Sequence, residues 1–169
     1  MIVTGSLLLL WDAGGLTRLA RREELARSVG REEFMTHAQQ MLETHPRGAA
    51  IESGALLECI DACFDCAQSC TADADADLVE DDVGMMIRCI RLCLDCADLC
   101  TTTGQILSRQ AEFEPDLARP VVEACAQMCR ACAEECQRHA DHHEHCGVCA
   151  VVCRRCDQAC IDVLSILAA

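Results

Sequence analysis

The spacing of its cysteines constrains the fold of this chain more than any other feature. Four runs of cysteines advance in steps of three and four residues, which is the spacing of one helix face. At about 100° per residue, the four thiols of a 4-3-4 run fall within an arc of about 60°. Each run therefore predicts a helix with a stripe of thiols along one face. In chain order the runs are Cys59, Cys63, Cys66 and Cys70; Cys89, Cys93, Cys96 and Cys100; Cys125, Cys129, Cys132 and Cys136; and Cys146, Cys149, Cys153, Cys156 and Cys160.

The core of such a protein would contain sulfur in place of aromatic rings. The chain of 169 residues is long enough for one domain, yet its only aromatic residues are Trp11, Phe34, Phe64 and Phe113. Reduced cysteine packs as a small hydrophobe, so 17 cysteines could serve packing alone. We favour metal binding, because the spacing repeats without error and Val, Leu or Ala would pack without the risk of oxidation.

The charge and hydropathy of the chain exclude several partners. The net charge of −14 repels nucleic acid and anionic membranes, and no basic stripe carries aromatic residues that could stack on bases. No segment reaches the length of about 20 apolar residues that spans a bilayer. The apolar run at residues 7–11 is short and has no preceding Lys or Arg, and Glu23 and Glu24 follow Arg21 and Arg22 directly. We therefore expect neither nucleic acid nor membrane as a partner.

A cytoplasmic location follows from the same residues, because no export signal is evident. Thiols stay reduced in the cytoplasm, which favours metal ligands over disulfides. The odd number of cysteines, 17, also excludes a complete set of disulfides within one chain.

The chain divides into an extension and a helical domain. Residues 1–34 contain no cysteine and are expected to be flexible or weakly helical, with one weak helix over residues 16–29. Residues 35–169 form the cysteine-lined domain. It begins with a short helix to about residue 44, followed by long helices at about 48–71, 77–109, 115–142 and 143–167. Long helices with short connections predict an all-α, antiparallel, up-down-up-down four-helix bundle with a short extra N-terminal helix.

Residues 72–76, an alternation of Ala and Asp, read as a solvated linker between the first two long helices. Asp73, Asp75 and Asp77 resemble the first three ligands of a calcium-binding loop, but Leu78 and Gly84 replace the required Gly and Glu. We therefore expect a turn in which Asp77 caps the next helix, with Glu80 as its capping-box partner.

Counting residues from the predicted turns spreads the sulfurs along the bundle axis. This distribution fits a container better than a catalytic centre, and no enzymatic activity is expected. The count places Cys70, Cys136 and Cys146 at the end with two turns, Cys59, Cys89 and Cys160 at mid-height, and Cys100 and Cys125 towards the opposite end.

Thiolates are soft ligands that select Cu(I), zinc or iron–sulfur clusters. Iron–sulfur clusters usually take cysteines grouped in loops. A zinc ion held by four thiolates keeps a double negative charge, and several such buried sites would repel one another. Cu(I) between shared thiolates approaches neutrality, so we predict many cuprous ions per chain, roughly one per cysteine. A metallothionein-like zinc buffer is the alternative.

A redox enzyme would need one cysteine whose pKa is lowered by a nearby cation. The cations closest to the stripes are Arg88, Arg130 and Arg154, which we expect to face solvent.

Four histidines, His139, His142, His143 and His145, bracket the last turn, at the end of the bundle where Cys136 and Cys146 lie. Histidine can accept Cu(I) and pass it to thiolates, so these residues are candidate metal ligands. A histidine near a helix C-terminus is also favourable through the helix dipole alone. The sequence leaves both readings open.

The other histidines and three methionines have simpler expectations. His37 and His45 lie on the short N-terminal helix and are predicted to be surface residues. Met85, Met86 and Met128 neighbour the stripes and are predicted to pack in the core.

The chain resembles the bacterial four-helix-bundle copper storage proteins. The repeated C-x₃-C-x₂-C-x₃-C pattern and the denser last run carry this resemblance, which covers about residues 35–169. It implies multiple Cu(I) ions bound by thiolates inside the bundle, a homotetramer, and the four histidines at an open mouth. It further implies the cytosolic kind, with a copper chaperone as a candidate partner. Residues 1–34 have no counterpart in the family pattern.

Overall fold

The computed structural model describes residues 36–50 and 53–168. The predicted extension, residues 1–34, and its weak helix lie outside the described residues. All described residues belong to one compact unit, Thr36–Ala169. Its elements are α2 (His37–Glu43), α3 (Ser53–Asp77), α4 (Val83–Leu107), α5 (Pro115–His139) and α6 (Glu144–Leu167).

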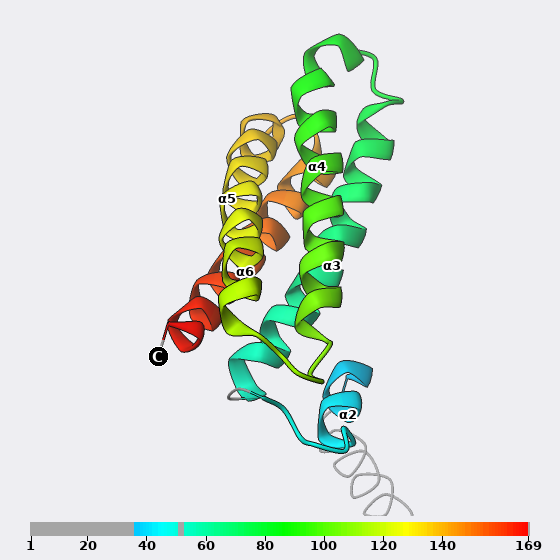
Figure 1. Ribbon diagram of the computed structural model, residues 1–169. Helices are drawn as coiled ribbons and strands as arrows, with labels where there is room; N and C mark the ends of the chain where they lie inside the picture. The colour runs from blue at the N-terminus through cyan, green and yellow to red at the C-terminus, as the bar shows by residue number, and fades with distance from the viewer. Residues whose placement is uncertain (1–35, 51–52, 169) are drawn as a thin grey trace, which may run out of the picture. The chain divides into compact units, whose positions relative to one another are not determined.

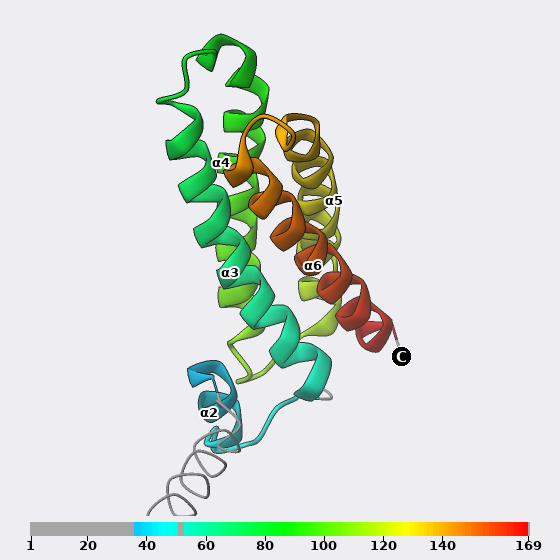
Figure 2. The same cartoon turned by 180° about the vertical axis from the view of Figure 1, so that it is seen from behind.

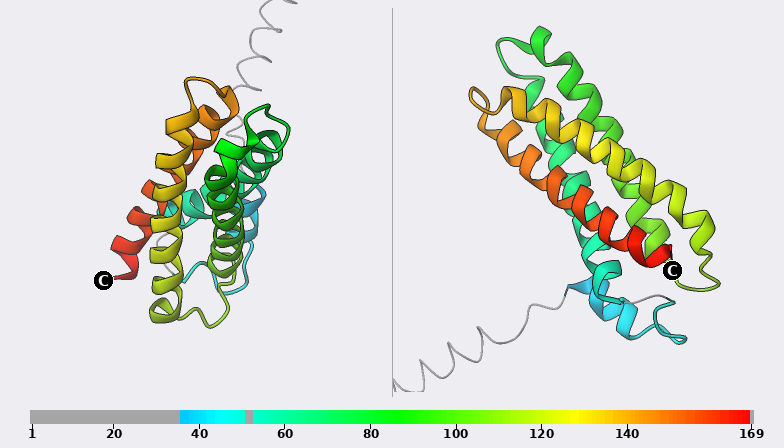
Figure 3. Two further views of the ribbon diagram at one scale, coloured as in Figure 1. Left: turned by 90° about the horizontal axis from the view of Figure 1, so that it is seen from above. Right: turned by 90° about the vertical axis from the view of Figure 1, so that its left-hand side faces the viewer.

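The four long helices form a bundle (Figure 1). Each helix packs on two neighbours, in the cyclic order α3, α4, α5 and α6, and short turns join α3 to α4 and α5 to α6. Figure 2 shows the α3 and α6 face from behind, and Figure 3 shows the same helices from above and from the side. The described residues contain helices and no strands, so the predicted all-α class is confirmed. None of these helices is long and apolar enough to cross a membrane.

The boundary between α3 and α4 differs from the prediction. α3 continues to Asp77, so residues 72–76 are helical, and α4 begins at Val83 with Asp82 at its N-cap position. The predicted solvated linker and the predicted capping role of Asp77 are therefore wrong. The physical reason is burial: Asp73 is 3% exposed and Asp77 is 0% exposed, because both lie on the inner face of α3.

The core confirms the inward direction of the thiols. All 17 cysteines are free and buried. Apolar side chains extend this core at one end, including Leu56 and Leu107. Met86 is fully buried as predicted, whereas Met85 is 74% exposed, so the packing prediction for Met85 is wrong. Met128 is partly buried against the core.

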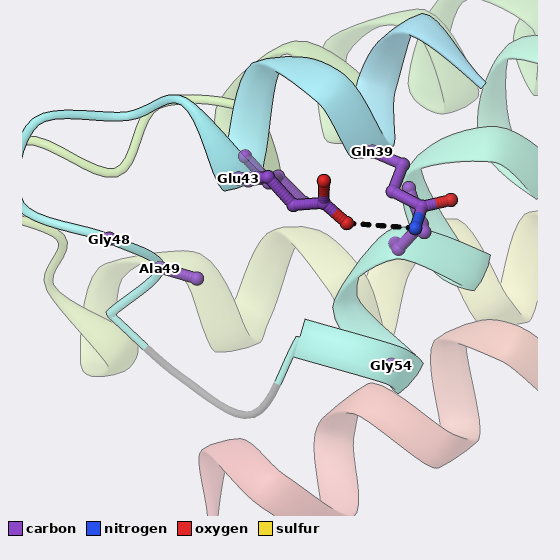
Figure 4. Close-up of a pocket in the computed structure, with 7 residues that line it drawn as sticks. Gln39, Glu43, Gly48, Ala49 and Gly54 are labelled. Atoms are coloured by element: carbon purple, nitrogen blue, oxygen red, sulfur yellow. Dashed lines mark hydrogen bonds between the residues drawn. The ribbon is translucent and has the colours of Figure 1, made fainter. Parts of the chain in front are cut away.

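The short helix α2 packs on α3 and lies apart from the thiols. A hollow of about 480 Å³ beside it is lined by residues of α2, the following loop and α3 (Figure 4). In this hollow Gln39 Nε2 donates a hydrogen bond of 2.9 Å to Glu43 Oε1. His37 and His45 line a second hollow of about 510 Å³, with Met41 and Phe64. Neither hollow is lined by a cysteine, so the thiol-lined core is the candidate metal centre.

Candidate metal centre

The thiols form two antiparallel ladders. A 4-3-4 spacing is identical when read backwards, so two antiparallel helices can match thiol to thiol at every step. Between α3 and α6 the Sγ–Sγ separations are 3.8 Å for Cys59–Cys160, 3.8 Å for Cys63–Cys156, 3.6 Å for Cys66–Cys153 and 3.6 Å for Cys70–Cys149. Between α4 and α5 they are 3.7 Å for Cys89–Cys136, 3.6 Å for Cys93–Cys132, 3.7 Å for Cys96–Cys129 and 3.7 Å for Cys100–Cys125.

Further sulfur contacts join the two ladders into one network. Cys66 lies 3.9 Å from Cys96, and Cys100 lies 3.8 Å from Cys156. Metal–thiolate bonds of about 2.3 Å place two sulfurs of one ion at most about 4.6 Å apart. The observed separations fall within this limit, so neighbouring thiols could share one ion without movement of the helices.

Sets of four sulfurs meet along the axis. Their sulfur atoms all lie within 4.8 Å of one another, and successive sets share members. Shared sulfurs suit a cluster in which one thiolate bridges two ions. Examples are Cys66, Cys96, Cys100 and Cys129; Cys66, Cys70, Cys96 and Cys153; and Cys70, Cys132, Cys149 and Cys153.

Contacts between thiols decide which of them ionise. Hydrogen bonds from Cys160 and Cys63 lower the pKa of Cys59 to about 5. Hydrogen bonds from Cys136 and Cys93 lower the pKa of Cys89 to about 3. A thiolate is thus stabilised by neighbours that keep their protons. Metal binding to all of them must therefore release protons.

Acidic side chains continue the thiol stripe at the end where the α3–α4 and α5–α6 turns lie. Asp73 Oδ2 accepts hydrogen bonds from the Sγ atoms of Cys93 at 3.2 Å and Cys136 at 3.4 Å. Asp77 Oδ1 accepts one from Cys146 Sγ at 3.5 Å. The second oxygen, Asp77 Oδ2, is buried without a hydrogen-bond partner. This end of the thiol-lined core therefore offers oxygen as well as sulfur to a cation, and we call it the mouth.

Burial shifts the charge of these acids. Loss of hydration raises the pKa of Asp77 from its ordinary value of 3.8 to about 7, and the nearby charges of Cys89 and Asp73 act in the same direction. Burial also raises the pKa of the Cys146 thiol, and the carboxylates of Asp73 and Asp77 add to this effect. The pKa of His145 is raised because hydrogen bonds to Asp73 and Glu80 outweigh its burial.

Three of the four predicted histidines come together at the mouth. His145 Nδ1 lies 2.7 Å from Asp73 Oδ1, and its Nε2 lies 3.1 Å from Glu80 Oε1. His143 Nδ1 lies 3.2 Å from the same Glu80 oxygen, and the rings of His143 and His145 are 5.7 Å apart. The ring of His139 is 6.5 Å from that of His143. His142 is exposed on the turn.

A buried carboxylate supports His139 from the same helix. Glu135 is 5% exposed, and its Oε1 lies 3.6 Å from His139 Nε2. Its Oε2 accepts hydrogen bonds from Arg88 Nε at 2.9 Å and Arg138 Nη1 at 2.7 Å. The side chain of Arg88 is itself 67% exposed.

The other two arginines beside the stripes, Arg130 and Arg154, are also exposed, as predicted, and bond Asp157 and Gln137.

Sequence reasoning missed the carboxylates of the mouth. The signal was available: Asp73 and Asp77 continue the alternating steps of three and four residues from Cys70. The alternation with alanine led to the reading of a linker. Glu80 lies beyond the end of α3, and Glu135 bonds Arg88 from α4 as well as Arg138 and His139 from its own helix, so the thiol spacing did not point to either.

The opposite end of the thiol-lined core, which we call the far end, is packed mainly with apolar residues. They continue the same stripes beyond the last thiols, and Cys59 and Cys160 lie next to them. The placement of Cys59 and Cys160 at mid-height is therefore wrong, as is that of Cys89, which lies near Asp73 at the mouth. The expected α3 ended too early and the expected α4 began too early, which misplaced Cys59 and Cys89, and Cys160 lies 3.8 Å from Cys59. The residues at the far end, all fully buried, are the apolar Leu56, Leu107, Val122 and Val163 and the polar Thr103.

This geometry, thiol ladders with one polar mouth, can be compared with known proteins. The family described as copper storage protein matches residues 52–165. The chain belongs to the copper storage protein family.

Solved structures of copper storage proteins from Streptomyces lividans are similar to this chain. The copper storage protein Ccsp from Streptomyces lividans, loaded with 10 copper equivalents, is 45% identical, with a TM-score of 0.74 over 76% of this chain and 98% of that chain. A cytosolic copper storage protein from Streptomyces lividans with five coppers is 50% identical, with a TM-score of 0.65 over 66% of this chain and 92% of that chain. No curated protein matches the chain. At these identities, this chain and the relatives share one helical-bundle fold.

Proposed function

We propose that this protein stores and detoxifies Cu(I) in the cytoplasm, without turnover, by binding many cuprous ions to the thiols inside the bundle. The observation that carries the proposal is the continuous sulfur network. It joins 16 of the 17 cysteines, and Cys146 lies at its polar end against Asp77 and His145; all 17 are buried and free. Copper-loaded relatives in the same family support the choice of metal.

The residues act at two levels in this proposal. The 16 cysteines of the two ladders, together with Cys146 at the mouth, are the storage ligands. His139, His143 and His145 receive copper at the mouth, and the exposed His142 meets it first on the turn. Carboxylates at the mouth hold these histidines in place, because Asp73 and Glu80 both bond His145.

Zinc buffering is not favoured by the geometry or by the family. The four-sulfur sets share members, so separate four-thiolate zinc sites would compete for the same sulfurs. Their buried double negative charges would also repel one another. Cu(I) tolerates bridging thiolates, which neutralise the array as it fills.

The proposal extends to assembly, partners and domains. By resemblance to the family, the protein is a homotetramer that receives copper from a chaperone protein. The storage domain is residues 35–169, and residues 1–34 are an extension that precedes the family match at residues 52–165.

The test is anaerobic loading of the reduced protein with excess Cu(I), followed by gel filtration and elemental analysis. The expected content is roughly one copper per cysteine, on the order of ten or more ions per chain. The Cys96→Ala variant and the Cys153→Ala variant should each lose about one ion, with retained helicity as the control. One or two coppers per chain would contradict storage, and stable zinc in the same competition would favour the zinc buffer.

A further inference from the structure

The turn between α3 and α4 exposes apolar side chains beside the mouth. Leu78 is 59% exposed, Val79 84%, Val83 37% and Met85 74%. Single exposed apolar residues are ordinary, but a group of them usually marks a contact surface. These four lie within one stretch of eight residues, 78–85, which we call the apolar tip.

The apolar tip is ordered by its own backbone. The amide of Val79 donates to Ala76 O at 3.1 Å, that of Val83 to Glu80 O at 3.2 Å, and that of Met85 to Asp82 O at 2.7 Å. Consecutive hydrogen bonds of this kind order the backbone from which the exposed side chains project. The tip therefore presents a preformed surface, which lowers the entropy cost of binding.

The apolar tip is tied directly to the mouth. Glu80, in the middle of the turn, lies within 3.2 Å of His143 and 3.1 Å of His145. Asp82 lies 3.6 Å from His143 Nε2. Figures 1 and 2 show the α3–α4 turn standing farther along the bundle than the α5–α6 turn. A large molecule that approaches the mouth therefore meets the apolar tip.

The charge around the apolar tip indicates which kind of molecule could bind there. Glu80, Asp81 and Asp82 follow one another in the turn, and no Lys or Arg occurs between residues 72 and 87. Together with the net charge of −14, these acids repel anionic membranes and a second copy of the same surface. A protein with apolar side chains inside a ring of Lys and Arg is complementary to the tip.

We infer that the apolar tip is the docking surface for a copper-carrying protein whose metal-binding loop combines apolar and positively charged side chains. The inference rests on the proposed function and specifies where its donor binds. Docked there, the carrier places its metal beside His143 and His145. Transfer is ligand exchange: one Cu–S bond to the carrier breaks for each bond formed to this chain, and copper stays Cu(I). The released carrier thiolate takes up the proton lost by each thiol that binds.

The experiment compares two copper sources delivered to the full chain. One source is a Cu(I)-loaded carrier domain with a Cys-x-x-Cys loop surrounded by lysines, and the other is the Cu(I) complex of a small chelator. The test variant is Val79→Ser with Met85→Ser. The matched control is Leu117→Ser with Ile161→Ser, two residues that are 67% and 41% exposed on α5 and α6.

The expected result is a transfer rate from the carrier about tenfold lower for the tip variant, and unchanged for the control. Uptake from the chelator should be the same for all three proteins. A carrier whose lysines are changed to glutamate should transfer more slowly to the unchanged chain, and salt should slow only the lysine carrier.

Three results would overturn the inference. Unchanged transfer from the carrier would show that the tip does not dock it. Equal slowing from both sources would show that the tip shapes the mouth itself. A change in oligomeric mass of the tip variant would assign the surface to contact between copies. Failure of the unchanged chain to take up copper from either source would instead contradict the proposed function.

Discussion

The two ends of the thiol-lined core follow the same helical periodicity and differ in chemistry. At the far end the stripes continue into Leu56, Leu107, Val122 and Val163, all 0–1% exposed. At the mouth they continue into Asp73 and other acids, beside three histidines. Helical steps of three and four residues thus set which positions face inward, and the residue types differ between the two ends. The thiol-lined core therefore has one apolar end and one polar end.

The largest effect is expected from a substitution that disrupts the packing of the far end. Leu107 is fully buried there, so Leu107→Ala removes packed methyl groups and leaves a cavity. The free energy of unfolding of the reduced, metal-free protein should fall by about 2–5 kcal/mol, measured by urea unfolding. The exposed Leu117→Ala, on the same end of the bundle, should change it by less than about 0.5 kcal/mol. Equal effects of the two substitutions would show that the far end is not a packed plug.

An intermediate effect is expected at the mouth. His143→Ala with His145→Ala removes two imidazole rings but no thiol. The initial rate of copper uptake from a weak chelator should fall by about tenfold, while the final copper content per chain stays the same. His37→Ala with His45→Ala, on α2 and in the loop that follows it, away from the thiols, is the matched control. Uptake at the normal rate by the mouth variant would place copper access elsewhere.

The smallest effect concerns the pH dependence of stability at the mouth. Because burial raises the pKa of Asp77 to about 7, the folded protein binds this proton more tightly than the unfolded chain. Stability from this group is present below about pH 4 and is lost as the pH rises through about 7. Asp77→Asn carries no charge, so its advantage in unfolding free energy should grow from pH 5 to pH 8, by on the order of 1 kcal/mol.

Thermal unfolding of the metal-free protein at both pH values measures this difference. Asp75→Asn, on the exposed face of the same helix, is the control and should show no such trend. An Asp77→Asn variant whose advantage shrinks with pH would mean that the carboxylate is stabilised in the folded state.

Much of the fold could be predicted because its signal is local. The thiol stripes, the four long helices and their antiparallel order follow from spacing along the chain and from short connections. The end of α3 could not be predicted in the same way. Asp73 pairs with His145, which lies 72 residues later in the chain, and accepts hydrogen bonds from Cys93 and Cys136 of other helices, so its burial depends on contacts between packed helices.

Sequence spacing likewise could not predict which of the four histidines come together in one cluster. Four occur within seven residues of sequence, yet His142 is exposed while His143 and His145 share Glu80. The direction of each ring depends on where the turn places it and on which carboxylates of α3 and the α3–α4 turn face it.

The sequence by itself determined that sulfur lines the bundle, because a helix repeats its faces every three to four residues whatever its surroundings. It also determined that antiparallel neighbours match thiol to thiol, since the 4-3-4 spacing has no direction. Only the tertiary structure decided which end is polar. That choice depends on carboxylates and histidines from different helices sharing one desolvated site, and such contacts exist only after the helices have packed.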